Sequence, residues 1–403
     1  MDLLQRLQDE FKEALPVRAA APSDAVDGVT SQAVAAPADA TTAQALVAWC
    51  GREKVSFIPR GGSTKLEMGA RPQSCDLIIS TENLNAIIEH DEGNATIAAQ
   101  TGITLAALNQ AVGEQRQFVP LEETGLQSGA TLGGIIATNY AGMTRLKYAA
   151  PRDLVVGLHA VLSDGRLVKA GSKVVKNVSG YDLNKIFIGS FGNLGLITEV
   201  TIRLRPNNAA SAVWRGQFKT WQEAIAQARA IFEGPFEPTA LRIHAHSATF
   251  FVLAQFDGVE KAVQIQMERL PAAVSQDDIG HQAGADGAGE LRLRAVLPLQ
   301  SAAAWAQQAQ QLGADQIAWD YGLGIIYAIY SKVPDNAVDV VTKLRAQAQA
   351  EGGLVVVERA PHDLKTPDFV WGAPPSAFAL MRSLKNTFDA AHVCAPGRFV
   401  GGL

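Results

Sequence analysis

Hydrophobic positions in the first half of the chain form short apolar runs separated by turns, with helical spacing between them. Runs typical of strands occupy residues 31–37, 55–59, 75–80, 95–102 and 195–206. The stretch 153–170 predicts two strands around a hairpin turn at Asp164 and Gly165. Helical spacing is present at 39–53 and 104–115, and Thr41 with Gln44 matches a capping box that would begin the first helix.

The pattern restarts after Pro206, where strands and helices alternate up to residue 361. Helices are expected at residues 220–234, 259–274, 301–313 and 336–352, and another within the tail, 377–403. Strands are expected within 240–258 and at 290–298, 324–330 and 354–361. This mixture predicts an α+β second domain, with residues 277–290 as a flexible loop.

Composition narrows the class of protein. The 403 residues carry a net charge of -5, which argues against a nucleic-acid-binding surface. No apolar run approaches the roughly 20 residues of a membrane helix, so no transmembrane segment is expected. The three cysteines are widely separated and predict neither a disulfide framework nor a metal site. These features favour a cytoplasmic protein.

A glycine-rich loop follows the strand expected at 55–59. Residues 60–65 read RGGSTK, and we call them the RGGSTK loop. Its glycines permit positive φ and a close approach of backbone to ligand, and successive N–H groups can form an anion-binding nest. Its two hydroxyls and two cations suit a phosphate or pyrophosphate. On this loop alone, a surface turn with solvated cations is an equal alternative.

Two further glycine-rich segments lie at 123–153 and 174–204. Small residues in the first let a backbone lie against a flat group, although they also let helices approach one another. Three such segments next to predicted strands are harder to explain as packing than any one of them.

Four stretches together resemble the FAD-linked oxidases of the vanillyl-alcohol-oxidase type. They are PRGGSTKLEMG at 59–69, TLGGIIATNYAG at 131–142, KNVSGYDLNKIFIGSFGNLGLITE at 176–199 and LKNTFDAAHVCAPGRF at 384–399. The resemblance implies an α+β fold with a two-subdomain, PCMH-type FAD-binding domain over residues 1–206, to which the tail, 381–403, returns. A smaller α+β cap would occupy 207–380, and Arg398 is expected to pin the tail to the FAD-binding domain.

The resemblance also implies which residues hold FAD. They are Pro59, Arg60, Gly61, Gly62, Ser63, Thr64, Lys65, Ser128, Ala130, Thr131, Gly133, Gly134, Ala137, Thr138, Gly142, Gly192 and Ile197. Many family members attach FAD covalently through a histidine in the pyrophosphate loop. The RGGSTK loop contains none, so the implied FAD is non-covalent.

The implied activity is oxidation of the CH–OH group of glycolate or a related D-2-hydroxy acid. The short cap most resembles that of the E subunit of bacterial glycolate oxidase. This implies a D-type catalytic subunit and an iron–sulfur F-type subunit as partners, through which the chain could lie at the inner membrane. We expect little turnover by this chain alone.

Two histidines are candidate catalytic groups. His244 and His246 alternate on a predicted strand and so share one face, beside Arg242. A polar strand face is the favoured interpretation because no third ligand accompanies them, and no metal is expected. Two alternatives stay open: a stand-alone D-2-hydroxy-acid dehydrogenase that uses these histidines, and a non-catalytic FAD-binding scaffold or electron-relay subunit.

Overall fold

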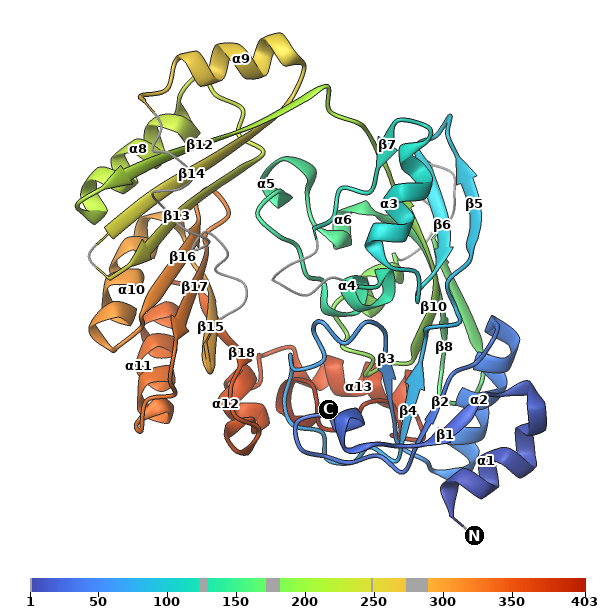
Figure 1. Cartoon of the computed structure of the whole chain (residues 1–403). Coiled ribbons are helices and arrows are strands. Elements are labelled where there is room, and N and C mark those ends of the chain that lie inside the picture. Colours follow the sequence, from blue (N-terminus) through green and yellow to red (C-terminus); the bar gives the residue numbers. More distant parts are fainter. Residues whose placement is uncertain (1, 123–128, 172–181, 248, 273–288) are drawn as a thin grey trace.

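A computed structural model describes residues 2–122, 129–171, 182–247, 249–272 and 289–403 (Figure 1). The helices of these residues are α1 (Leu3–Phe11), α2 (Ala40–Glu53), α3 (Leu105–Gly113), α4 (Leu132–Thr138), α5 (Arg145–Tyr148), α6 (Pro151–Leu154), α7 (Asn184–Phe187), α8 (Trp221–Glu233), α9 (Glu260–Glu268), α10 (Leu299–Gln311), α11 (Ala337–Ala350), α12 (Pro367–Trp371) and α13 (Phe378–Phe388). Short 3₁₀ turns lie at Lys12–Ala14, Pro22–Asp24, His362–Leu364 and Val400–Gly402. Most of the predicted loop at 277–290 lies outside the described residues.

The first sheet has the strand order β1-β2-β4-β3. Its strands are β1 (Val17–Ala19), β2 (Ala33–Ala35), β3 (Phe57–Arg60) and β4 (Leu77–Ser80). Helices α1 and α2 bury their apolar residues against one face of it. The predicted capping box is wrong: Asp39 caps α2 by accepting a hydrogen bond from the backbone N–H of Thr42, while Thr41 lies inside the helix. An aspartate at this position satisfies the free N–H as well as threonine would.

The second sheet has the order β5-β6-β10-β8-β9 and is antiparallel throughout. Its strands are β5 (Ile87–Asp91), β6 (Thr96–Gln100), β8 (Val155–Val161), β9 (Leu167–Gly171) and β10 (Leu196–Arg203). The predicted hairpin is confirmed, because β8 and β9 pair around a turn in which Gly165 has a φ of +83°. The core between this sheet, α3 and α4 fixes the position of α4.

The third sheet, which we call the cap sheet, has the order β12-β14-β13-β16-β17-β15-β18. Its strands are β12 (Ala210–Phe218), β13 (Ala240–His246), β14 (Thr249–Gly258), β15 (Leu291–Val296), β16 (Gln316–Asp320), β17 (Ile325–Tyr330) and β18 (Leu354–Arg359). Helices α8, α10 and α11 cover one face (Figure 1), which carries the largest apolar core. The other face is directed toward α4 and α5. Strands β12 and β16 were not predicted, and the domain boundary at residue 206 stays a prediction.

The tail returns to the first sheet, as the red segment at the base of Figure 1 shows. Cys394 forms a parallel bridge with Phe57 at the edge strand β3. Lys385 is buried and donates hydrogen bonds to Asp389 and to the carbonyl oxygens of Asn193 and Cys394. The tail is therefore part of the wall behind the RGGSTK loop. The short strands β7 (Gln117–Phe118) and β11 (Arg205–Pro206) pair separately.

Candidate functional site

The RGGSTK loop leaves the end of β3 and presses against the residues that begin α4. A Cβ atom added at Gly62 would lie 1.7 Å from the carbonyl oxygen of Gly129, and one at Gly61 would lie 2.0 Å from Oγ1 of Thr131. These contacts leave no room for a side chain at either glycine. Neither glycine has a positive φ, which occurs instead at Ser63. The glycines are therefore required for the close approach between the loop and the start of α4, whereas the positive φ that was also expected of them does not occur.

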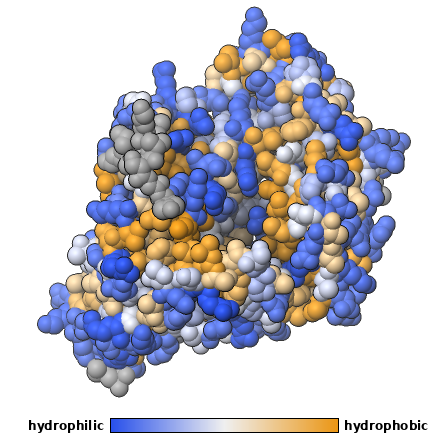
Figure 2. Space-filling view, turned by 180° about the vertical axis from the view of Figure 1, so that it is seen from behind, coloured by the Kyte–Doolittle hydropathy of each residue, from blue (hydrophilic) through white to orange (hydrophobic). Residues whose placement is uncertain are grey.

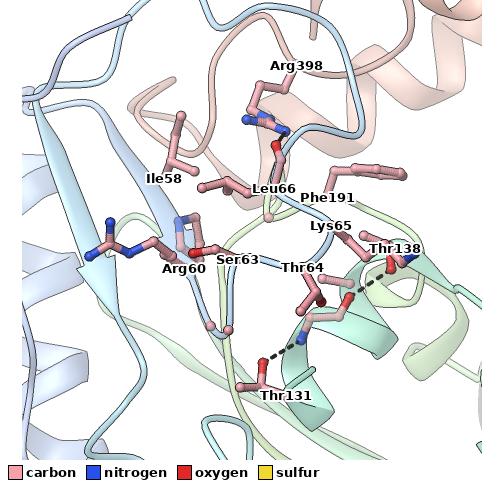
Figure 3. A pocket seen from close by; sticks show the side chains of 16 residues that line it. Ile58, Arg60, Ser63, Thr64, Lys65, Leu66, Thr131, Thr138, Phe191 and Arg398 are labelled. Atoms are coloured by element: carbon pink, nitrogen blue, oxygen red, sulfur yellow. Dashed lines mark hydrogen bonds between the residues drawn. The ribbon is translucent and has the colours of Figure 1, made fainter. Parts of the chain in front are cut away.

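A hollow with about 570 Å³ of empty space lies beside this loop (Figure 3). Most of the predicted cofactor residues line it: Pro59, Arg60, Gly61, Gly62, Ser63, Thr64, Lys65, Thr131, Gly134, Ala137, Thr138 and Gly192. A second hollow of about 390 Å³ shares several of these residues and adds Gly133 and Ile197. The shared residues join the two hollows into one groove beside the RGGSTK loop and α4.

Helix α4 supplies the smooth wall of the groove. Its apolar residues Leu132, Ile135 and Ile136 are buried in the core of the second sheet. The opposite side presents glycine, alanine and threonine, so little more than backbone faces the hollow. Thr138 donates its hydroxyl hydrogen to the carbonyl oxygen of Gly134 at 2.8 Å, which keeps that hydroxyl against the helix. Such a wall accepts a flat or extended group at close range.

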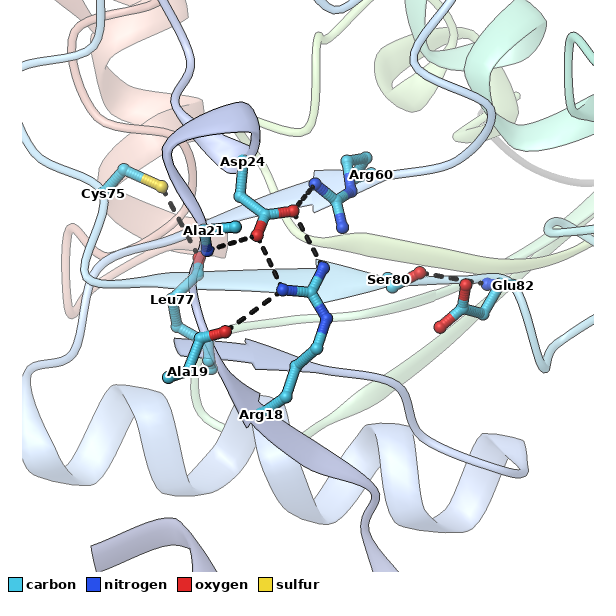
Figure 4. Close-up of polar contacts among 9 residues, drawn as sticks. All are labelled: Arg18, Ala19, Ala21, Asp24, Arg60, Cys75, Leu77, Ser80 and Glu82. Carbon is cyan, nitrogen blue, oxygen red and sulfur yellow. Dashed lines mark hydrogen bonds and ion pairs between the residues drawn. The ribbon is translucent and has the colours of Figure 1, made fainter. Parts of the chain in front are cut away.

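Positive charge surrounds the loop. Asp24 accepts hydrogen bonds from Arg18 at 2.7 and 2.9 Å and from Arg60 at 2.6 Å (Figure 4). The hydrogen bond from Arg18, supported by Arg60, holds the pKa of the Asp24 carboxyl well below its usual range. One carboxylate is thus shared by two guanidinium groups. Lys65 adds a third cation, placed 3.9 Å from the centre of the Tyr140 ring.

These features fit the diphosphate of FAD. Among the described residues, neither hollow is lined by an aspartate, a glutamate or a histidine. An anion in the groove would therefore meet backbone N–H groups, hydroxyls and cations without opposing carboxylates.

Two of the predicted cofactor residues, Ala130 and Gly142, line neither hollow. Ala130 is buried in the core of the second sheet. Gly142 faces Glu122, and a Cβ atom added at Gly142 would lie 1.5 Å from a carboxylate oxygen of Glu122. Burial raises the pKa of Glu122. Ser128 lies outside the described residues.

Several residues of the groove were not predicted from the sequence to lie in it. They are Ile58, Leu66, Phe191 and Arg398 in the larger hollow, and Thr81, Thr101, Gly195 and Leu196 in the smaller. Phe191 and Gly195 belong to the third glycine-rich segment, which was a usable signal. No sequence signal placed Arg398 in the groove, because the tail brings it there from a distant part of the chain.

The two histidines lie on β13 of the cap sheet, away from both hollows. Leu241, Ile243 and Ala245 pack against the cap helices, so alternation puts Arg242 and His244 on the other face, which we call the inner face. Nε of Arg242 donates to Asp320 at 2.6 Å. Burial, supported by the charge of Arg242, lowers the pKa of His244 to about 4. The ring is therefore neutral at pH 7.

This buried histidine gives a pH-dependent stability. In the unfolded chain His244 takes up a proton near its usual pKa of 6.5, whereas the folded ring stays neutral down to about 4. Its contribution is fully present above pH 6.5 and is lost as the pH falls toward 4, by up to about 3 kcal/mol. We expect the free energy of unfolding of His244→Gln, measured with urea across this range, to fall less steeply than that of the wild type. Parallel slopes would contradict the assignment.

The described residues offer neither a candidate metal site nor a membrane-spanning helix. They contain no group of three or more histidine, cysteine, aspartate or glutamate side chains placed to hold a metal ion. No helix among them is long and apolar enough to cross a membrane.

Comparison with known proteins places the groove in context. Residues 31–171 match the family described as FAD binding domain. The glycolate oxidase subunit GlcD of Bacillus subtilis is 30% identical over 262 residues, which cover 61% of this chain and 56% of that protein. A D-lactate dehydrogenase of Archaeoglobus fulgidus is 28% identical over 409 residues, which cover 92% and 91%. A solved alkyldihydroxyacetonephosphate synthase shares the fold, with a TM-score of 0.66 and 16% identity over 91% of this chain and 76% of that one.

Proposed function

We propose that the chain is an FAD-linked oxidase that oxidises glycolate or a related D-2-hydroxy acid. The observation that carries the proposal is the groove, whose loop, small-residue helix and cations suit FAD. The substrate class is supported by relatives named as a glycolate oxidase subunit and a D-lactate dehydrogenase.

The chain's own residues would hold the cofactor at distinct points. The backbone of Gly61 to Thr64 and the cations Arg60 and Lys65 would bind the diphosphate. The small-residue side of α4 would lie along the rest of the molecule. Bound FAD supplies the two-electron acceptor for oxidation of a CH–OH group. We propose that it is held without a covalent bond, since no histidine is among the described residues that line the groove.

The substrate would bind between the groove and the inner face of the cap sheet. Arg292 and Arg294 lie at 3.3 and 2.8 Å from oxygens of Glu358 on this face. Arg292 also lies 4.5 Å from the ring centre of Tyr327 on the same face, and burial raises the pKa of Tyr327. Guanidinium groups in a water-poor site are suited to the carboxylate of a hydroxy acid. Figure 2 shows a recess between the two halves of the molecule from behind.

His244 is our candidate for the group that takes the hydroxyl proton. It is neutral at pH 7, and its Nε2 is buried with no hydrogen-bond partner among the described residues. A neutral imidazole with an unused nitrogen can accept a proton. His246 lies at the end of the same strand and is less buried, so its role would be secondary.

We further propose that the chain acts within a complex containing a D-type subunit and an iron–sulfur F-type subunit. The similarity to a protein named as an oxidase subunit supports an assembly of this kind. The three cysteines of this chain are all free and buried, and the electrons of its flavin would pass to an iron–sulfur acceptor on another subunit.

The test is anaerobic mixing of the flavin-loaded chain with excess glycolate, D-lactate or L-lactate while following the flavin band near about 450 nm. We expect glycolate and D-lactate to bleach the band slowly in the isolated chain, and L-lactate to leave it unchanged. Flavin that no hydroxy acid reduces, either alone or with both partner subunits, would contradict the proposal and favour the non-catalytic scaffold. Rapid bleaching in the isolated chain would favour the stand-alone dehydrogenase, and in either case His244→Ala should slow the bleaching.

A further inference from the structure

The returning tail places an arginine against the RGGSTK loop from a distant part of the chain. Arg398 is 3% exposed and lines the larger hollow (Figure 3). Its Nη2 donates to the carbonyl oxygen of Leu66 at 2.7 Å and to that of Met68. Its own carbonyl accepts hydrogen bonds from the backbone N–H of Ala70 at 3.0 Å and from Nε1 of Trp371 at 3.1 Å. The tail and the segment that follows the loop are therefore interlocked.

A second cation, from the segment between β18 and α12, is buried as well. Lys365 is 1% exposed, and its Nζ lies 2.5 Å from Oδ1 of Asp27 and also donates to the carbonyl oxygen of Glu67. The negative charge of Asp27 also favours the charged form of Arg398, although no hydrogen bond joins the two side chains. Burial lowers the pKa of both cations.

The hydrogen bonding of Arg398 is incomplete among the described residues. Its Nη1 is buried and has no hydrogen-bond partner among these residues. Oδ2 of Asp27 is likewise buried without a hydrogen-bond partner. Two buried cations thus share one carboxylate next to a hollow that no described acid lines. Burying charge without full pairing is costly, so this arrangement favours an anion in the hollow.

We propose that Arg398 is a binding residue for the diphosphate of FAD, which uses Nη2 to hold the loop and Nη1 to supply positive charge to the hollow. Binding of the cofactor and locking of the tail onto the loop then stabilise each other. The proposal rests on FAD binding and is independent of which hydroxy acid is oxidised. Riboflavin, which lacks phosphate, should not benefit from this arginine.

The test compares Arg398→Met with Arg359→Met, because both arginines contact the segment that follows the loop. Nε of Arg359 donates to Glu67 at 2.9 Å from the cap side, outside the hollow. Binding of FAD and of riboflavin to the flavin-free protein is followed by flavin fluorescence. For Arg398→Met we expect FAD affinity to fall by roughly 10- to 100-fold and riboflavin affinity by less than about threefold. Arg359→Met should change neither by more than about threefold.

Each other outcome overturns the proposal. Equal losses for FAD and riboflavin would make Arg398 a structural pin of the loop, and unchanged FAD affinity would place it outside the site. If Arg398→Met does not fold, Arg398→Lys keeps the charge and loses the forked geometry. Its FAD affinity should then fall while riboflavin affinity is kept, and equal losses would again reject the proposal.

Discussion

Replacing Gly62 by valine is expected to abolish FAD binding and leave the protein folded. The added Cβ would lie 1.7 Å from the carbonyl oxygen of Gly129, so the RGGSTK loop must move away from the residues that begin α4. That movement separates the two walls of the groove, and backbone atoms on both sides cannot yield as a flexible side chain would. We expect FAD affinity to fall at least about 100-fold, which corresponds to about 2.7 kcal/mol.

The matched control is Gly113→Val, because an added Cβ at Gly113 meets nothing within 4 Å. Gly113 ends α3 in the same part of the molecule, so this variant carries the same chemical change without the clash. His244→Ala, which alters the cap sheet, should also keep its flavin. Flavin content after purification and circular dichroism give the comparison. Wild-type flavin occupancy in Gly62→Val would contradict the placement of the loop.

The largest expected effect on stability is that of Lys385→Met. Lys385 is 2% exposed and donates to Asp389 at 2.7 Å, to the carbonyl oxygen of Asn193 at 2.7 Å and to that of Cys394 at 2.8 Å. Methionine leaves a fully buried Asp389 carboxylate without its cation, which costs about 3–5 kcal/mol. Asn193 follows Gly192 of the groove, so FAD affinity should fall as well.

Urea unfolding of the flavin-free protein measures this loss, with the exposed Lys332→Met as the control. The double variant Lys385→Met with Asp389→Leu removes both charges and should recover part of the lost stability. A single Lys385→Met variant as stable as the control would show that the tail is not held by this pair.

Much of this architecture could be predicted from local patterns. The alternation in 195–206 and the turn at Gly165 gave β10 and the β8–β9 hairpin. The glycine-rich segments located both walls of the groove. These features depend on residues near one another in sequence, where periodicity and turn chemistry are informative.

What the sequence did not indicate depends on contacts between distant residues. Strand β16 has no clear apolar alternation, and all but its first residue are buried in the centre of the cap sheet. Two carboxylates near the N-terminus, Asp24 and Asp27, bind Arg60 of the loop and the distant Lys365, and no local motif pairs them. The position of Arg398 in the groove has the same origin.

The measurement that tests the central claim most directly is the fate of flavin when the purified protein is denatured. The account predicts a yellow protein whose flavin stays in solution as free FAD after the acid-precipitated chain is removed by centrifugation, because no histidine is among the described residues that line the groove. Flavin that sediments with the chain would contradict non-covalent binding. A colourless protein that FAD cannot reconstitute would contradict the cofactor site itself.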